Sequence, residues 1–315
     1  MGAKAYKKDF SSLGWRMVIS TVVIYGIQIA GQFIALAINA DWIDNMDILL
    51  AASMIPMYAI GYPAAFLIVQ AGSEKRMVEK HKMKPSQFMV AFLMSYALLM
   101  LGNIVGVGVT SIIGLLKGDP VDNALTDLVA NGNLWISSIY IVILAPIFEE
   151  YLFRKIICDR VVKYGQGMAV IISGLVFGLF HGNFNQCFYA FTIGCFFAYI
   201  YVKTGNVKYT IGLHMMVNFI GSVVGGLLLQ NIDLTDDLFS MPLSDMIIFA
   251  LYMLLIYGMM IAGAVLLLIN LSKFKLSPGE ITLRKGNKFE ISIINVGMFV
   301  FCELFVLMMV GQALM

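Results

Sequence analysis

The amino-acid sequence predicts an all-α protein, a polytopic bundle of about nine transmembrane helices. Of its 315 residues, 60% are hydrophobic and only 13% are charged, whereas a soluble domain is typically about half apolar and a quarter charged. The apolar residues gather in long runs, and most charged residues lie between these runs. Because a helix needs about 20 mostly apolar residues to cross the hydrocarbon core of a bilayer, these runs are predicted to be membrane spans.

Nine segments meet or approach this length. They are 17–39, 48–71, 87–116, 134–158, 166–182, 185–202, 207–230, 244–271 and 291–314. The first is longer than the apolar region of a signal peptide, about 7–15 residues, and is therefore interpreted as a retained span. We divide the chain into N-terminal spans (1–133), a core that carries the polar motifs (134–230) and C-terminal spans (231–315).

The basic residues predict how the spans are oriented, because Lys and Arg collect on the cytoplasmic side of a membrane protein. If the N-terminus is inside, the segments 1–16, 72–86, 154–165, 203–208 and 272–290 are cytoplasmic and hold 20 of the 21 basic residues. The segments on the other side hold Lys117 and nine aspartates: Asp41, Asp44, Asp47, Asp119, Asp122, Asp127, Asp233, Asp236 and Asp237. We therefore expect a multi-pass protein of the cell membrane with a cytoplasmic N-terminus.

Three further expectations concern the segment 272–290, the net charge and the last span. The polar segment 272–290 contains two short apolar stretches around Gly286 and Asn287, which predict a small β-hairpin. The net charge of +2 gives no reason to expect a nucleic-acid partner. Glu303 is a carboxylate within the last span, and we expect it to contact a polar group of the first or second span.

Ionisable residues within apolar helices are costly, so each one needs a reason. The first group is Glu149, Glu150 and Arg154 in the fourth span. Glu150 and Arg154 are four residues apart, share a helix face and can pair. Glu149 lies about 100° around the helix from Glu150. This spacing predicts that the pair supports the structure and that Glu149 faces a cavity as a base.

Two histidines lie on apolar helices, each four residues from a second notable residue. Phe177 and His181 end the fifth span, where a short connection to the sixth span is expected to place His181 near the depth of Glu149. His214 and Asn218 share one face of the seventh span, where both could donate hydrogen bonds to a negative oxygen. Taken alone, either pair could simply hold neighbouring helices together.

Taken together, the three patterns Glu-Glu-x-x-x-Arg, Phe-x-x-x-His and His-x-x-x-Asn resemble the CAAX proteases and bacteriocin-processing enzymes, relatives of the type 2 prenyl-protein endopeptidases. The resemblance covers roughly residues 134–230 and identifies that segment with the catalytic core of an intramembrane endopeptidase. It implies a membrane-anchored protein or peptide as substrate and the lipid bilayer as the setting. Nothing specific to a prenyl group is visible in the sequence.

The resemblance also implies roles for the site residues. Glu149 and His181 would activate a water, while His214 and Asn218 would stabilise the oxyanion of the tetrahedral intermediate. No cofactor is needed for this chemistry. Alternatively, Glu149, His181 and His214 would hold zinc or another divalent metal, since carboxylate and imidazole are ordinary zinc ligands. In either case we expect the four residues to meet in one polar cavity that opens towards the cytoplasm.

Two other functions stay open at this point. A non-catalytic bacteriocin-immunity or secretion-accessory protein could share the fold, but it would have no need for both Glu149 and His181. A proton-coupled transporter could use the carboxylates as a relay. Transporters usually have two related halves, and the sequence contains no such repeat.

Overall fold

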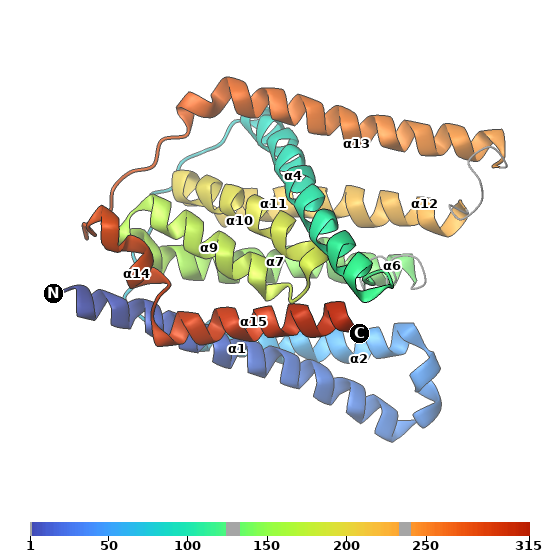
Figure 1. Cartoon of the computed structure of the whole chain (residues 1–315), viewed down its shortest axis with the longest axis horizontal. Helices are drawn as coiled ribbons and strands as arrows, with labels where there is room; N and C mark the ends of the chain where they lie inside the picture. Colours follow the sequence, from blue (N-terminus) through green and yellow to red (C-terminus); the bar gives the residue numbers. More distant parts are fainter. Residues whose placement is uncertain (1, 124–132, 233–240) are drawn as a thin grey trace.

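The computed structural model describes residues 2–123, 133–232 and 241–315, which form a bundle of helices (Figure 1). Within these ranges there is no β-strand, and eight helices are long and apolar enough to cross a membrane. They are Ala3–Ile38, Met46–Gln70, Pro85–Lys117, Leu134–Tyr164, Phe184–Thr204, Val207–Leu228, Leu243–Lys273 and Val296–Leu314. The prediction of an all-α, multi-pass membrane protein is therefore confirmed.

The fifth predicted span, 166–182, is a shorter helix. Helix α9 (Gln166–Phe180) has 15 residues, and a helix of that size is about 22 Å long, less than the roughly 30 Å of the hydrocarbon core. It ends at His181, and the turn to α10 (Phe184–Thr204) passes through Gly182, whose φ of 66° is easily adopted by glycine. The α9–α10 hairpin thus carries His181 at its tip.

Three of the long spans are α-helices interrupted by one or two π-helical segments. The second span joins α2 (Met46–Pro56) to α3 (Tyr62–Gln70) through Met57–Gly61. The fourth contains α6 (Leu134–Ser138), Ile139–Leu144, α7 (Ala145–Glu150), Tyr151–Cys158 and α8 (Asp159–Val161), and the seventh contains α11 (Val207–Asn218), Phe219–Val224 and α12 (Gly225–Asn231). Such segments frequently occur at functional sites.

The segments predicted to be cytoplasmic meet at one end of the bundle. Lys163 forms an ion pair with Asp9 at 2.8 Å, which joins segments 154–165 and 1–16. Arg76 pairs with Glu280 at 3.0 Å, which joins 72–86 to 272–290. The backbone N–H of Ile281 donates to the carbonyl of Lys163 at 2.9 Å and links these two groups.

The fifth basic segment, 203–208, belongs to the same end, because the N–H of His81 donates to the carbonyl of Thr204 at 2.8 Å. We call this end of the bundle, formed by the five basic segments, the basic end. Its cytoplasmic location stays a prediction. Of the aspartates predicted on the opposite side, Asp127, Asp233, Asp236 and Asp237 lie outside the described residues.

The first and last helices pack side by side. Helix α1 (Ala3–Ile38) lies along α15 (Val296–Leu314), as Figure 1 shows. The N–H of Gly297 donates to the hydroxyl of Ser11 at 3.0 Å. One hydrophobic core includes Phe10, Phe153 and Phe301, so the three predicted parts of the chain are packed together.

The segment after α13 (Leu243–Asn270) does not form the predicted hairpin. Residues 281–283 have no regular structure, and Lys288–Ser292 is a short helix, α14. The hairpin prediction is wrong because this segment directs its backbone hydrogen bonds to the start of α9. The carbonyl of Ser277 accepts from the N–H of Gln166 at 3.1 Å.

The expectation for Glu303 is also wrong. Helix α15 turns Phe301 and Phe305, both fully buried, towards the bundle. Glu303 lies between them on the opposite face and is exposed. Among the described residues it has no hydrogen bond or ion pair, so it does not contact a polar group of the first two spans.

Candidate active site

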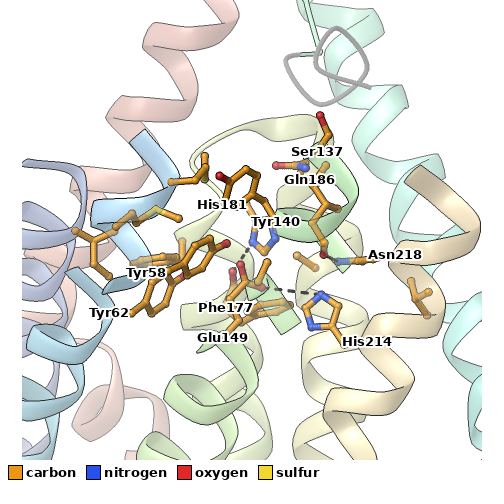
Figure 2. A pocket seen from close by; sticks show the side chains of 18 of the residues that line it. Tyr58, Tyr62, Ser137, Tyr140, Glu149, Phe177, His181, Gln186, His214 and Asn218 are labelled. Carbon is orange, nitrogen blue, oxygen red and sulfur yellow. Dashed lines mark hydrogen bonds and ion pairs between the residues drawn. The ribbon is translucent and has the colours of Figure 1, made fainter. Parts of the chain in front are cut away.

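The structure brings the four predicted site residues to one cavity of about 450 Å³. Glu149 comes from α7, His181 from the tip of the α9–α10 hairpin, and His214 and Asn218 from α11. Figure 2 shows the carboxylate of Glu149 and both imidazole rings turned towards the same space. Residues separated by up to 69 positions in the sequence therefore share one chemical environment.

Glu150 is held by Arg154 and His214, and its carboxylate also has a hydrogen bond with Thr210. Its Oε2 lies 3.0 Å from Nε of Arg154, and both side chains are completely buried, as the four-residue spacing predicts. Its Oε1 lies 3.0 Å from Nδ1 of His214, a contact between helices that the sequence did not predict. The guanidinium of Arg154 in turn lies 4.1 Å from the ring centre of Phe177, a cation–π arrangement. Phe177, Arg154 and Glu150 therefore form a support that fixes the ring of His214.

The hydrogen bonds of the two histidines define which ring nitrogen faces the cavity. Nδ1 of His181 lies 2.9 Å from the carbonyl oxygen of Phe177. Because a carbonyl only accepts, Nδ1 carries the proton and Nε2 of the neutral ring is an acceptor. Nδ1 of His214 faces Glu150, and its Nε2 lies 3.9 Å from Oε2 of Glu149.

Asn218 is oriented by a backbone carbonyl. Its Nδ2 donates to the carbonyl of Ile141 at 2.8 Å, and Ile141 lies in the π-helical segment Ile139–Leu144. Since the acceptor is a carbonyl, the nitrogen end of the amide is identified. One of the two N–H groups of Nδ2 is used in this bond, which leaves the second one for a ligand in the cavity.

Aromatic side chains fill the space between the cavity and the basic end. The rings of Tyr62 and Phe148 are tilted against each other with centres 5.5 Å apart, and Phe66 contacts Phe148 at 5.9 Å and Tyr151 at 4.9 Å. Both α3 and the segment after Tyr151 run from here towards the basic loops. These rings therefore separate Glu149 from the basic end.

The cavity extends in the other direction. Leu50, Ser137 and Gln186 line it, and they come from the parts of α2, α6 and α10 that lie away from the basic end. This is opposite to the predicted opening towards the cytoplasm. The prediction took Arg154 and Lys208 as markers of the nearby cytoplasmic surface, whereas Arg154 is completely buried as the partner of Glu150.

The predicted metal ligands have suitable donor atoms but not a suitable arrangement. Carboxylate and imidazole bind zinc, and each ring directs Nδ1 to an oxygen, as metal-bound histidines commonly do. In the ranges that the structure describes, however, no three His, Cys, Asp or Glu side chains are placed to hold one ion.

Several cavity residues lie outside the three motifs. Tyr25 and Gln28 of α1 and Tyr58 and Tyr62 of the second span form one wall. The sequence signal that could have identified them is the presence of tyrosine and glutamine in an apolar span, since each of these side chains needs a hydrogen-bond partner when buried. The hydroxyl of Tyr25 donates to the carbonyl of Phe180 at 3.3 Å, next to His181.

Comparisons with known proteins agree with the motifs. The family model described as type II CAAX prenyl endopeptidase Rce1-like matches residues 131–220. The membrane-embedded CAAX protease MroQ of Staphylococcus aureus (strain USA300) is 26% identical over 213 residues, which cover 63% of this chain and 84% of MroQ. The putative membrane peptidase YdiL of Bacillus subtilis (strain 168) is 34% identical over 77 residues, 24% of this chain and 32% of YdiL.

No solved structure matches the chain significantly. The relatives support a membrane endopeptidase in general terms. Over residues 131–220, the segment that holds every residue of the three motifs, the chain is matched to the type II CAAX prenyl endopeptidase Rce1-like family, in agreement with the resemblance predicted from those motifs.

Proposed function

We propose that this protein is an intramembrane endopeptidase that hydrolyses a peptide bond of a membrane-associated protein or peptide, with Glu149 as the base that activates water. One observation carries the proposal. Glu149 is the only carboxylate among the described residues of the cavity wall, and the neighbouring Glu150 is occupied by Arg154 and His214. Glu149 is thus the acid–base group available to a ligand.

The proposed first step takes place between Glu149 and His181. A water bound there gives one proton to the Glu149 carboxylate, while Nε2 of His181 accepts a hydrogen bond from its other O–H. The water oxygen attacks the carbonyl carbon of the scissile bond, and the carbonyl oxygen becomes an oxyanion. Glu149 then passes its proton to the departing amine nitrogen, so that the products are a carboxylic acid and an amine.

The oxyanion needs donors that are already in place. The second N–H of Asn218 is one, because Ile141 fixes the amide and leaves that group free. His214 is the other. Since its Nδ1–H faces Glu150, donation from Nε2 requires a ring with both protons, and that positive ring would lie between Glu150 at 3.0 Å and Glu149 at 3.9 Å.

The proposal is tested by comparing the membrane peptidomes of cells that contain the wild-type protein and Glu149→Gln. Peptides that disappear in the variant identify substrates, and a synthetic version of one is then tested with purified protein. Equal cleavage by both proteins would refute the role of Glu149. Such an outcome would reopen the transporter and immunity-protein alternatives, which no contact described above favours.

The same preparation answers the question of a metal. Elemental analysis is performed together with cleavage before and after treatment with a chelator. Cleavage that survives chelation supports the mechanism above. A stoichiometric metal whose removal abolishes cleavage would make Glu149, His181 and His214 ligands and would replace that mechanism.

A further inference from the structure

The part of the cavity remote from the basic end contains polar groups that the chemistry above does not use. Gln28, Ser137, Tyr140 and Gln186 line it, and none of them is charged. Ser137 is only 1% exposed, and its hydroxyl has no hydrogen-bond partner among the described residues. A buried hydroxyl without a partner is costly, so this group indicates a place where a polar ligand atom binds.

Gln186 is oriented towards the same space. Its Oε1 accepts from Nδ2 of Asn183 at 2.8 Å, and its own N–H donates to Oδ1 of Asn183 at 2.9 Å. The oxygen end of the Gln186 amide is therefore held at the tip of the α9–α10 hairpin. Its NH2 group donates to the hydroxyl of Tyr189, which also lines the cavity, and has a second N–H available to a ligand. In Figure 2, Gln186 and Ser137 lie at one end of the view and Glu149 and His214 at the other.

We propose that this remote half of the cavity, defined by Ser137 and Gln186, is a subsite for the polypeptide backbone of the substrate, which reaches Glu149 from the side of the bundle opposite the basic end. The proposal rests on the endopeptidase function above. A peptide inside a membrane exposes N–H and C=O groups that need partners, and a neutral hydroxyl and amide supply them without attracting charge. The aromatic rings of Tyr62, Phe66 and Phe148 contact one another on the other approach, between Glu149 and the basic end.

This assignment defines the class of substrate. With the basic end in the cytoplasm, as the charges predict, the cleaved segment is an uncharged stretch of a membrane-spanning or exported peptide. A lipidated tail that enters from the cytoplasm would instead have to pass the aromatic rings. The subsite therefore favours a substrate presented from the outer half of the bilayer.

The direction of access is measured without any cleavage assay. Two variants are made in a protein that lacks the four native cysteines, one with Gln186→Cys and one with Arg284→Cys. Position 284 serves as the reference because Arg284 is exposed at the basic end. A membrane-impermeant methanethiosulfonate is applied to intact cells and to inverted vesicles. We expect position 186 to react from the side opposite to position 284. Reaction from the same side, or from neither side while position 284 reacts, overturns the proposal.

The subsite is measured with a peptide identified by the peptidome comparison. Gln186→Leu and Ser137→Ala each remove one hydrogen bond to the substrate, so we expect KM to rise about two- to tenfold with a smaller change in kcat. Asn185→Leu is the matched control, because Asn185 is adjacent to Gln186 but its amide donates to the carbonyl of Asp122 instead. An unchanged KM in both subsite variants, or an equal rise in the control, overturns the assignment.

The two proposals fail in different ways. If peptides are cleaved but position 186 reacts only from the basic side, the subsite is wrong and the endopeptidase stands. If position 186 reacts as expected but wild-type and Glu149→Gln membranes contain the same peptides, the endopeptidase and the substrate assignment are wrong, and only the direction of access remains.

Discussion

The site depends on two adjacent glutamates whose surroundings differ. Glu150 is completely buried between Arg154 and His214, whereas Glu149 lies on the cavity wall, with its Oε2 3.9 Å from Nε2 of His214. The helical rotation of about 100° between neighbours is sufficient to produce this difference. One residue type therefore serves as support at one position and as the candidate base at the next.

Substitution of each glutamate should separate these roles. Glu149→Gln keeps the size of the side chain and strands no paired charge, so we expect cleavage to be abolished and thermal unfolding to be unchanged. Glu150→Gln leaves Arg154 buried without its charge partner, and removal of one member of a buried pair costs about 3–5 kcal/mol. We expect Glu150→Gln and Arg154→Gln to lower the unfolding temperature in detergent.

The contact with His214 adds an effect that spacing did not predict. From the sequence alone, the activity of Glu150→Gln is expected to fall largely in proportion to the amount of folded protein. Because Glu150 also orients the His214 ring at 3.0 Å, we now expect a further loss of activity per folded molecule. A stable but inactive Glu150→Gln beside an active Glu149→Gln would reverse the two roles.

Asn218 provides a separate measure of oxyanion stabilisation. Asn218→Ala removes the free N–H, and loss of one such donor typically lowers kcat about 100- to 1,000-fold. Ser222→Ala is the matched control on the same helix, since Ser222 donates only to the backbone carbonyl of Asn218, at 2.6 Å. A similar kcat in both variants would remove Asn218 from the mechanism. The assay is steady-state cleavage of an identified peptide.

The helices were predictable to the extent that hydrophobicity determines them. The third and sixth spans, predicted at 87–116 and 185–202, are Pro85–Lys117 and Phe184–Thr204. The first was predicted from residue 17 but begins at Ala3, because a helix can continue beyond the membrane where hydropathy no longer reports it. The π-helical segments were not predictable, since they depend on how neighbouring helices pack.

Close helix packing gives a prediction for α4 (Pro85–Lys117), which crosses α10 at Gly102. A Cβ atom added to Gly102 would lie 2.7 Å from the carbonyl oxygen of Phe188, whereas one added to Gly108 would meet nothing within 4 Å. We expect Gly102→Ala to destabilise the protein by about 1–3 kcal/mol, the usual cost of overpacking. Gly108→Ala, the control on the same helix, should unfold at or above the wild-type temperature in detergent.

Across the whole molecule, the chemistry was more predictable than its surroundings. Glu149, His181, His214 and Asn218 belong to motifs that contain residues four positions apart. Such residues share one face of a helix, so these motifs could be recognised in the sequence. The wall that faces them includes Tyr25, Gln28, Tyr58 and Tyr62 from the first two spans, outside residues 131–220 of the family match. No motif in the sequence identifies these tyrosines or this glutamine as site residues. Which tyrosine and glutamine side chains reach the cavity depends on how the bundle folds.

The orientation of the bundle decides what the direction of the cavity means. The five basic segments meet at one end, and the positive-inside rule predicts that this end lies in the cytoplasm. Arg284→Cys should therefore react with an impermeant thiol reagent only in inverted vesicles. Ile43→Cys, at an exposed position (61%) between the first two spans, should react only in intact cells. Labelling of position 284 from outside would show that the predicted orientation in the membrane is inverted. The remote half of the cavity would then receive its substrate from the cytoplasm.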